Sequence, residues 1–322
     1  MNFEEALDLV TQKIANIRYP KQPVQLYEPV VYLLAMKGKK IRPALTLLSC
    51  NLFKDDVHGA LPVALAWEIF HNFTLMHDDL MDKAEIRRGQ PTVHKKWNEN
   101  TAILSGDAML ILSYKTLAKS PTKYLKILLD LFTTTAIEIC EGQEYDMQFE
   151  SRLDVREEEY LNMIRLKTAV LLGACLKSGA IAGNADLKDQ DLLYDFGIHL
   201  GIAFQIQDDL LDVYGDASEF GKQIGGDILC NKKTYLLVSA LNAADEKEKA
   251  ELLHWMNVHD QPEKKIQAVT ECYNRLMVRN QAHSRMEDYY LRAVRALDEV
   301  SVAMDKKQIL NDIAKKLINR KS

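Results

Sequence analysis

The sequence predicts an all-α fold from three observations. Apolar residues recur at spacings of three and four along almost the whole chain, which is the period of a helix with one buried face. Alternating runs rich in β-branched residues, which would indicate strands, are missing. The prolines lie near the ends of the periodic segments, where they begin or end helices. We therefore expect that most of the helices are long.

The ends of the expected helices can be justified in chain order. Glu4 and Glu5 suit the first turn of an N-terminal helix, where acids interact favourably with the helix dipole. Three prolines, the last of them Pro29, surround the next connection, and Pro43 suits a first helical turn. The glycine-rich stretch 215–231 is typical of a long loop, and loops of this length are usually functional. The expected helices cover residues 2–17, 28–36, 42–53, 58–83, 99–119, 123–149, 156–183 and 188–214, and several more lie between 231 and the end.

Composition agrees with an ordinary globular protein. The 322 residues are 47% hydrophobic and 27% charged, with a formal net charge of −5, so neither charge nor any basic tail suggests nucleic acid. The five scattered cysteines form no C-x-x-C pair, which argues against a disulfide framework or a zinc site. No basic leader and no run of membrane-spanning length is present. We expect a cytoplasmic protein without an integral membrane segment.

Two acidic motifs point to the function. Asp-Asp-x-x-Asp occurs at residues 78–82 and again at 208–212, each time after an apolar helical stretch. Carboxylates at these spacings share one helix face, and they are costly to remove from water unless cations compensate them. A third acidic match, at residues 4–8, is interpreted as the solvated start of a helix. The alternative for the motifs at 78–82 and 208–212 is that they are solvated surface residues without a function. We instead expect two facing sets of aspartates that hold divalent metal ions.

Basic residues near these motifs complete a pattern for phosphate binding. The turn at residues 38–43 places cations before a helix start, where free backbone N–H groups also favour an anion. Arg87 and Arg88 follow the first motif, and guanidinium groups match phosphate oxygens. Lys222 and Lys232 flank the glycine-rich loop. Metal ligands together with these cations predict a pocket for a polyphosphate or for two diphosphates.

Taken in order, these pieces resemble the trans-type isoprenyl diphosphate synthases, the family of farnesyl and geranylgeranyl diphosphate synthases and polyprenyl synthetases. The resemblance spans nearly the whole chain, and the ordered set is far more specific than any one piece. The matching pieces are Gly38-Lys39-Lys40-Ile41-Arg42-Pro43, Glu68-Ile69-Phe70-His71, His77-Asp78-Asp79-Leu80-Met81-Asp82, Arg87-Arg88-Gly89, Gly106-Asp107, Lys167-Thr168, Phe204-Gln205-Ile206-Gln207-Asp208-Asp209-Leu210-Leu211-Asp212, Gly221-Lys222 and Asn231-Lys232.

The resemblance implies a fold, a reaction and partners. The fold would be a single large helical bundle of the isoprenoid synthase type over residues 1–322, with the two motifs on opposite walls of a central active-site cavity. The reaction would be head-to-tail condensation of isopentenyl diphosphate with an allylic diphosphate, using three Mg²⁺ ions. A homodimer is also implied. The basic end, Asn319-Arg320-Lys321-Ser322, resembles a tail that closes over isopentenyl diphosphate in some members, although such ends are also commonly frayed.

The resemblance also assigns roles to residues of this chain. In each case the match is to a position of the family pattern. Metal would be bound by Asp78, Asp79, Asp82 and Asp208, with possible help from Asp209 and Asp212; the allylic diphosphate by Arg87, Lys167 and Lys222, with Lys232 nearby; isopentenyl diphosphate by Lys39, Arg42, His71 and Arg88; and the carbocation would be stabilised near Lys167 by Thr168 and Gln205.

Product length depends on the residues one turn before the first motif. Thr74 lies one helical turn before Asp78, and Phe73 lies beside it. In the family, bulk at these positions stops chain elongation. One aromatic here suits a C20 product, so the expectation is geranylgeranyl diphosphate, with farnesyl diphosphate as the alternative. Ordinary core packing of Phe73 is the competing interpretation.

Two readings from other functional classes remain open at this point. The chain could be a non-catalytic subunit of a heteromeric prenyl synthase, although both aspartate motifs are intact. It could also be a metal-dependent terpene cyclase or a head-to-head prenyl synthase. The cations at Lys39, Arg42 and Arg88 discriminate, because a cyclase has no isopentenyl diphosphate to hold.

Overall fold

The computed structural model describes residues 1–215 and 224–320, and the fold in these ranges is all-α, as predicted. By packing, the chain divides into two compact units. Unit 1 comprises residues 1–133, 174–193 and 301–309, and unit 2 comprises residues 134–173, 194–300 and 310–322. The prediction of a single domain over the whole chain stays a prediction.

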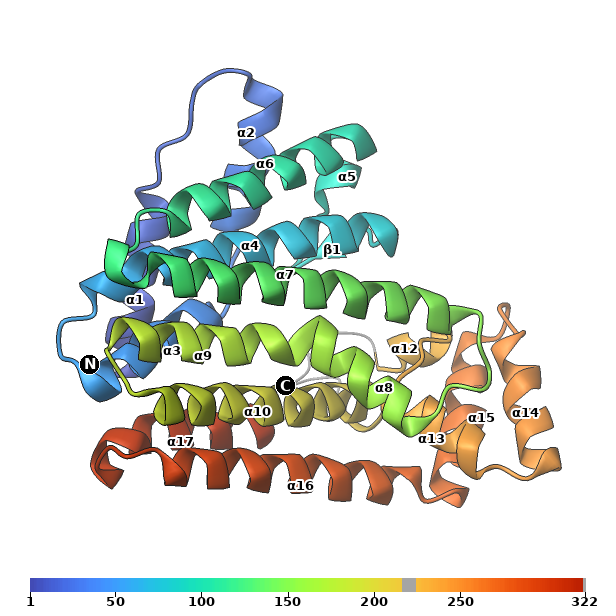
Figure 1. The fold of residues 1–322 in the computed structure, drawn as a ribbon. Helices are drawn as coiled ribbons and strands as arrows, with labels where there is room; N and C mark the ends of the chain where they lie inside the picture. Colours follow the sequence, from blue (N-terminus) through green and yellow to red (C-terminus); the bar gives the residue numbers. More distant parts are fainter. Residues whose placement is uncertain (216–223, 321–322) are drawn as a thin grey trace. The chain divides into compact units, whose positions relative to one another are not determined.

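Unit 1 is built mainly from the first half of the chain (Figure 1). Its first helix is fixed by a capping box, in which Asn2 and Glu5 satisfy each other's backbone N–H groups. A proline in the first turn begins the long helix α4. The elements are α1 (Phe3–Ala15), α2 (Val24–Ala35), α3 (Ile41–Phe53), the 3₁₀ turn η1 (His58–Ala60), α4 (Leu61–Met81), β1 (Ile86–Arg87), β2 (Gln90–Pro91), α5 (Val93–Lys96) and α6 (Glu99–Leu117).

The core of unit 1 lies around α4, which runs side by side with α6 (Figure 1). Trp67 is completely buried and stacks on Phe132 with ring centroids 4.3 Å apart, and Phe70 meets Phe132 edge-on at 5.3 Å. The Trp67 indole N–H donates to the Ser178 hydroxyl at 3.0 Å, so its polar atom is satisfied inside the core. This packing fixes α4, and α4 carries the first aspartate motif.

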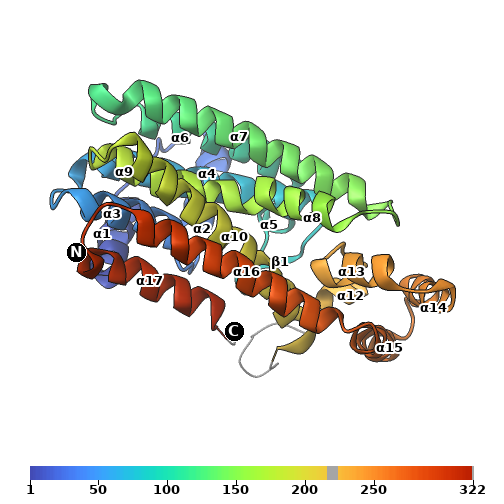
Figure 2. The ribbon, with the colours of Figure 1, turned by 60° about the horizontal axis from the view of Figure 1, so that its bottom comes forward.

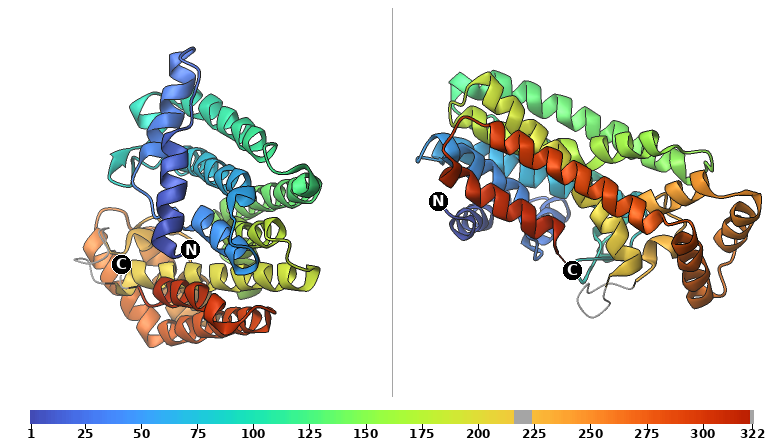
Figure 3. Two further views of the ribbon diagram at one scale, coloured as in Figure 1. Left: turned by 90° about the vertical axis from the view of Figure 1, so that its left-hand side faces the viewer. Right: turned by 90° about the horizontal axis from the view of Figure 1, so that it is seen from below.

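Unit 2 contains most of the helices of the second half of the chain. Thr234 caps α13 by accepting a hydrogen bond from the Leu237 N–H, and Asp245 with Glu248 forms a capping box on α14. Helices α14 and α15 lie side by side (Figures 2 and 3). The elements are α8 (Glu157–Ile164), the π-helical turn η2 (Arg165–Ala169), α12 (Gly226–Leu229), α13 (Tyr235–Ala243), α14 (Glu246–Met256), α15 (Pro262–Arg275) and α16 (Val278–Glu299).

Four further helices contribute residues to both units. They are α7 (Thr122–Glu150), α9 (Val170–Ala182), α10 (Leu187–Tyr214) and α17 (Met304–Ile318). Among the described residues, no helix is long and apolar enough to cross a membrane.

Four details differ from the sequence-based expectation. The stretch 215–231 is not loop throughout, because its described part contains the short helix α12 at Gly226–Leu229. Pro29 does not precede α2 but lies inside it, because that helix begins at Val24. Residues 156–183 do not form one regular helix, since the π-helical turn at Arg165–Ala169 separates α8 from α9. A short β-hairpin follows the first aspartate motif, where Arg88 and Gly89 both take positive φ, the turn geometry that matches the twist of paired strands.

Candidate active site

The first aspartate motif forms the C-terminal end of α4. Asp78 and Asp79 occupy its last turn and Asp82 is the C-cap residue. The C-terminus of a helix is the negative end of its dipole, so three carboxylates there repel the helix as well as one another. Asp79 is only 2% exposed. This arrangement is stable only where cations offset the negative charge.

Arg87, on strand β1, supplies one such cation. Its Nε and Nη2 atoms donate to Oδ1 of Asp79 at 2.9 and 2.5 Å, and Nη2 lies 3.9 Å from Asp78. Burial raises the pKa of Asp79 despite the opposing effect of Arg87. Burial acts to lower the pKa of Arg87, but the hydrogen bond to Asp79 and its charge outweigh burial and raise it. The hairpin thus places the Arg87 guanidinium beside the aspartates of the first motif.

A separate basic cluster lies further back along α4. Arg42, in the first turn of α3, has Nη1 3.3 Å from Nε2 of His71. The guanidinium of Arg88 lies against Gly38, where even a Cβ atom would come within 2.7 Å of it. Lys39 is exposed on the turn between these residues. The structure therefore brings together three of the four side chains predicted for isopentenyl diphosphate, with Lys39 at the edge.

The electrostatics of this cluster favour an anionic ligand. Burial, together with the charges of Arg42 and Arg88, holds the pKa of His71 well below its usual value. Burial also lowers the pKa of Arg42, and its buried Nε has no hydrogen-bond partner among the described residues. Glu68, 4% exposed, is the internal counter-charge, and burial raises its pKa. An unsatisfied buried donor beside a second guanidinium is what a phosphate group would complete.

The two clusters are arranged along one helix. His71 and Asp78 are seven residues apart on α4, which is two turns and about 10 Å. Both therefore lie on the same side of the helix. A single element of unit 1 thus presents carboxylates at its end and cations two turns earlier, as two different diphosphates would require.

The residues predicted to limit chain length lie between these clusters. The ring of Phe73 packs against Phe70 and His77, with centroid distances of 5.6 and 4.9 Å. The Thr74 hydroxyl donates to the backbone carbonyl of His71 at 2.8 Å. Thr74 therefore bonds to its own helix. Phe73, which is the larger side chain, is the better candidate for the residue that limits chain length.

The second aspartate motif lies in α10 of unit 2. Asp208 has a side chain that is 37% exposed, and it forms an ion pair with Arg320. The Arg320 guanidinium also lies over the ring of Phe204, 4.1 Å from its centroid, and the Arg320 carbonyl accepts from Gln207 at 3.4 Å. Burial lowers the pKa of Arg320 to about 10. The described part of the basic C-terminus therefore packs on this motif; Lys321 and Ser322 lie outside the described residues.

The other two aspartates of this motif are engaged by protein groups. Asp209 is 3% exposed and accepts hydrogen bonds from the Tyr160 hydroxyl, from the Tyr235 N–H at 2.7 Å and from the Gln205 amide at 3.3 Å. Burial, and next the charge of Asp227, raises the pKa of Asp209 to about 7. Asp212 accepts from the Asp227 N–H at 3.0 Å.

The π-helical turn presents two predicted residues to this region. Lys167 donates to Asp146 at 2.5 Å, and the Thr168 hydroxyl donates to Oε1 of Gln205 at 3.4 Å. The turn lies close to α7, since a Cβ atom on Gly142 would be 2.3 Å from the backbone nitrogen of Lys167. A cavity of about 50 Å³ gathers these groups; its lining includes Asp146, Tyr160, Lys167, Thr168, Gln205, Asp209 and Lys232.

The two remaining predicted cations differ in what the structure describes. Lys232 is exposed, and its backbone N–H donates to the Asp227 carbonyl at 2.9 Å. Its side chain helps to line the small cavity. Lys222 lies outside the described residues, so its role stays a prediction.

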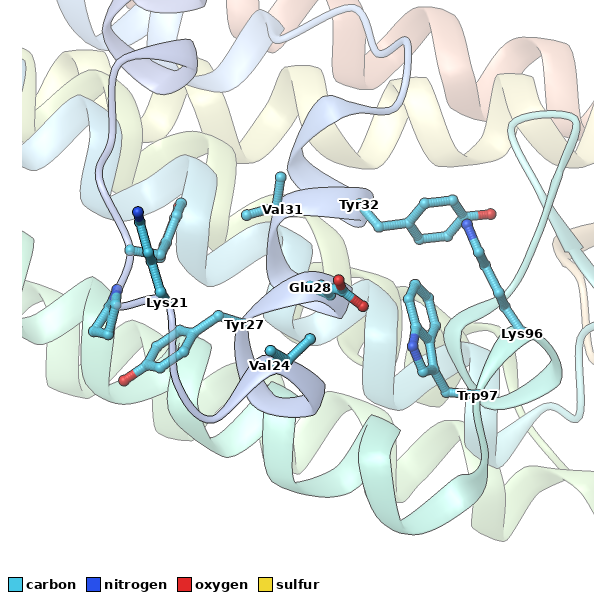
Figure 4. A pocket seen from close by; sticks show the side chains of 10 residues that line it. Lys21, Val24, Tyr27, Glu28, Val31, Tyr32, Lys96 and Trp97 are labelled. Atoms are coloured by element: carbon cyan, nitrogen blue, oxygen red, sulfur yellow. The ribbon is translucent and has the colours of Figure 1, made fainter.

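A larger cavity of unit 1, of about 750 Å³, contains none of the predicted residues (Figure 4). Along its rim Lys96 lies 3.7 Å from the centroid of the Tyr32 ring and 4.9 Å from that of Trp97. The Tyr32 hydroxyl donates to the Pro91 carbonyl at 2.8 Å. These contacts tie α2 to the hairpin and to the segment that follows it. Because Glu28 is the one acidic residue in its lining, this cavity lacks the ligands that diphosphate chemistry needs.

The donor set of each aspartate motif suits magnesium. Carboxylate oxygens are the ligands that Mg²⁺ prefers, usually with one or two carboxylates and the phosphate oxygens of a substrate. Within residues 1–215 and 224–320, no three His, Cys, Asp or Glu side chains are already placed to hold an ion. Asp78 and Asp82 of unit 1, and separately Asp208 of unit 2, would each bind Mg²⁺ with the help of a phosphate ligand.

A comparison with protein families decides the classification. The family model for polyprenyl synthetase matches residues 23–276. The chain belongs to the polyprenyl synthetase family. It is a trans-prenyltransferase, and its reaction is prenyl chain condensation.

Relatives and solved structures of this family match over nearly the full length. A short chain isoprenyl diphosphate synthase of Methanothermobacter thermautotrophicus is 38% identical, over 96% of this chain and 90% of the relative. A geranylgeranyl diphosphate synthase of Sulfolobus acidocaldarius is 37% identical, over 94% and 92%. A geranylfarnesyl diphosphate synthase of Natronomonas pharaonis is 34% identical, over 98% and 96%. A crystal structure of a geranylgeranyl pyrophosphate synthase superimposes with a TM-score of 0.94 at 41% identity, covering both chains completely.

Sequence reasoning missed several residues at the site of this polyprenyl synthetase. Tyr160 was not singled out, because a lone tyrosine in a helical pattern carries no signal of its own. Glu68 belongs to a matching family piece and Asp146 to none of those quoted, and nothing in the sequence identified their partners, the basic cluster and Lys167. A signal existed for Glu68, since it lies three residues before His71 and therefore on the same helix face.

Proposed function

We propose that this enzyme condenses isopentenyl diphosphate with allylic diphosphates in a Mg²⁺-dependent 1′–4 reaction, and that its main product is geranylgeranyl diphosphate. The observation that carries the proposal is the arrangement on α4, where a basic cluster around His71 lies two turns from the aspartates at Asp78 and Asp79. One end suits a metal-bound diphosphate and the other suits a diphosphate held by cations alone.

In this proposal the basic cluster holds isopentenyl diphosphate. Arg42 offers an unsatisfied buried N–H, and Arg88 offers a planar guanidinium from the hairpin. His71 is neutral, so it contributes a single N–H donor rather than a charge. Lys39, exposed at the edge, would add a mobile ammonium group. No metal is needed here.

The allylic diphosphate is assigned to the aspartates. Asp78, Asp79, Asp82 and Asp208 are the proposed Mg²⁺ ligands, with Asp212 as a further candidate, and three ions are expected when diphosphate is bound. Bound Mg²⁺ would stabilise the negative charge that develops on the departing diphosphate. Arg87, Lys167, Lys222 and Lys232 would contact the same group.

The chain's own residues act on the charges that appear when the allylic C–O bond breaks. The bond electrons leave with diphosphate, and the allylic fragment becomes positive. Thr168 and Gln205 present neutral oxygen atoms beside Lys167. These oxygen atoms would offset the positive charge of the allylic fragment without forming a bond to it. The double bond of isopentenyl diphosphate then attacks, and a proton is lost to the released diphosphate. No protein nucleophile is required.

The C20 product is assigned from Phe73. Its ring is held between Phe70 and His77, so it forms a rigid stop below the aspartates. The relatives act on chains of more than one length, since geranylgeranyl and geranylfarnesyl synthases both match. A single aromatic stop favours C20; farnesyl diphosphate is the alternative product. The enzyme is further proposed to be a cytoplasmic homodimer.

The test is incubation of the purified protein with isopentenyl diphosphate and each of the C5, C10 and C15 allylic diphosphates, with and without Mg²⁺. Chromatography of the dephosphorylated alcohols then gives the product length. A Mg²⁺-dependent C20 alcohol is expected. A C15 or C25 alcohol would retain the reaction and overturn the assignment of product length, and no condensation with any primer would favour a non-catalytic subunit or a cyclase.

A further inference from the structure

We infer that Asp209 is a positioning residue for Gln205 rather than a metal ligand, and that it fixes the Gln205 carbonyl oxygen toward Thr168. This inference rests on the proposed function, because the oriented oxygen matters only if an allylic cation forms beside it. All the residues concerned belong to unit 2.

The first step is that the oxygens of Asp209 are already occupied. Oδ2 accepts from the Tyr160 hydroxyl and from the Tyr235 N–H, and Oδ1 accepts from Nε2 of Gln205. The donors come from α8, from the start of α13 and from α10 itself. A metal ion would have to displace these donors from a side chain that is 3% exposed. Its neighbour Asp208 differs, since that carboxylate is 37% exposed and pairs with the side chain of Arg320 alone among the contacts of the described residues.

The second step concerns the amide of Gln205, whose two ends are chemically opposite. A carboxylate accepts hydrogen bonds and cannot donate them. The Gln205 NH₂ group must therefore face Asp209, and the carbonyl oxygen must face the other way. That is the orientation observed, with Oε1 accepting from the Thr168 hydroxyl. The orientation of the amide therefore follows from its hydrogen bond to Asp209, and the shape of the amide alone would not decide it.

The third step is the consequence for the reaction. The oxygen of an amide is the negative end of its dipole and the NH₂ group is the positive end. Fixed dipoles aimed at developing charge lower a barrier because they need no reorganisation during the reaction. With Asp209 in place, the negative end faces the small cavity that Lys167 and Thr168 also line. An inverted amide would present its positive end to the allylic cation.

The decisive experiment compares Asp209→Asn with the matched neighbour Asp208→Asn. An asparagine can donate to the Gln205 oxygen, so the amide is free to invert. All variants are assayed at one fixed pH. For Asp209→Asn we expect kcat to fall roughly 10- to 100-fold with an unchanged Mg²⁺ half-saturation. For Asp208→Asn we expect the Mg²⁺ half-saturation to rise by about tenfold or more, as when a metal site is disturbed.

A second readout separates orientation from general damage. An ammonium analogue of the allylic cation that carries a diphosphate should bind more weakly to Asp209→Asn, whereas the thiolodiphosphate of the same chain, which lacks the positive charge, should bind as to the wild type. If Asp209 acts through Gln205, Asp209→Asn should cause no further loss in a Gln205→Leu background. Independent, multiplying losses in this double-mutant cycle would overturn the inference.

Two further variants guard against a folding defect. Tyr160→Phe removes one donor but keeps the carboxylate, so its melting temperature should fall while binding of the ammonium analogue is retained. Asp209→Glu keeps an acceptor of the same charge and should retain more of that binding than Asp209→Asn. An equal shift of Mg²⁺ half-saturation in Asp209→Asn and Asp208→Asn would identify Asp209 as a ligand. A wild type without Mg²⁺-dependent condensation would instead overturn the proposed function.

Discussion

His71 is held neutral by its surroundings. Burial and the charges of Arg42 and Arg88 lower its pKa well below the usual value, and Nη1 of Arg42 lies only 3.3 Å from its ring. Protonation would place a third positive charge in this cluster. In the unfolded chain the same residue titrates near pH 6.5.

This difference predicts acid sensitivity. Below about pH 6.5 the unfolded chain binds a proton that folded His71 does not, so the free energy of unfolding falls as the pH falls. Above that pH both states are neutral and the effect vanishes. Replacing His71 by Asn should reduce the loss of stability between pH 7.5 and 5.5 by at most about 1.4 kcal/mol. Urea unfolding of both proteins at the two pH values measures this, and an equal loss in the two proteins would contradict it.

Phe73 gives a prediction about product length. Its ring lies between Phe70 and His77, and its removal would break no side-chain hydrogen bond because the ring has no polar atom. Phe73→Ala should open the space below the aspartates and shift the product from C20 to longer alcohols in the chromatographic assay. Phe53→Ala is the matched control, because Phe53 is also half-buried but ends α3. An unchanged product from Phe73→Ala would rule this ring out as the stop.

At the scale of elements, the helices were predictable and the irregular segments were not. Apolar spacing located α1, α3, α4, α6, α7 and α10 to within a few residues, because each buries one continuous face. Pro29 was misread because a proline usually marks a helix boundary, yet α2 accommodates it in the interior. A π-helical turn adds one residue to a turn without changing which residue types are apolar, so 156–183 looked like one helix.

The candidate site was predictable to a similar degree. Motif order pointed to Arg42, His71 and Arg88, and the structure brings them together. Motif order could not show that Asp209 accepts a hydrogen bond from Tyr160, because that contact joins positions 49 residues apart. Sequence spacing reports which side chains share a helix face, and contacts between elements depend on packing that no local pattern encodes.

The close approach of α7 to the π-helical turn gives an element-scale prediction. A Cβ atom on Gly142 would lie 2.3 Å from the backbone nitrogen of Lys167 and 2.7 Å from the carbonyl carbon of Leu166. Backbone atoms cannot swing away as a side chain can. Alanine gains up to about 1 kcal/mol of helix propensity, but overpacking costs about 1–3 kcal/mol. Gly142→Ala should therefore lower the melting temperature and reduce kcat by displacing Lys167 and Thr168.

The control for this variant is Glu141→Ala. Glu141 is the preceding residue of α7 and is exposed, so its removal should leave both the melting temperature and kcat near the wild-type values. Calorimetry and the condensation assay on the three proteins make the comparison. Equal behaviour of Gly142→Ala and the wild type would show that the turn can yield.

At the scale of the whole molecule, the packing of a single chain does not explain an exposed apolar face on α6. On α6, Ile103, Leu104 and Ile111 are 45%, 60% and 67% exposed. Leu104 and Ile111 are two turns apart and so lie on the same face. Burying such a side chain contributes about 1.5–3 kcal/mol, and contiguous exposed apolar residues mark interaction sites. The homodimer proposed for this enzyme gives this face a partner in a second copy of the chain.

This assignment predicts the outcome of a charge placed on that face. The wild type should have a solution mass of twice 36.7 kDa, measured by light scattering after size-exclusion chromatography. Ile111→Asp should shift it to the monomer, because a carboxylate buried at the interface without a partner is strongly unfavourable. Leu187→Asp is the control, since Leu187 is 65% exposed but begins α10, and it should remain dimeric. A monomeric wild type, or dissociation of both variants alike, would show that α6 is not the contact face.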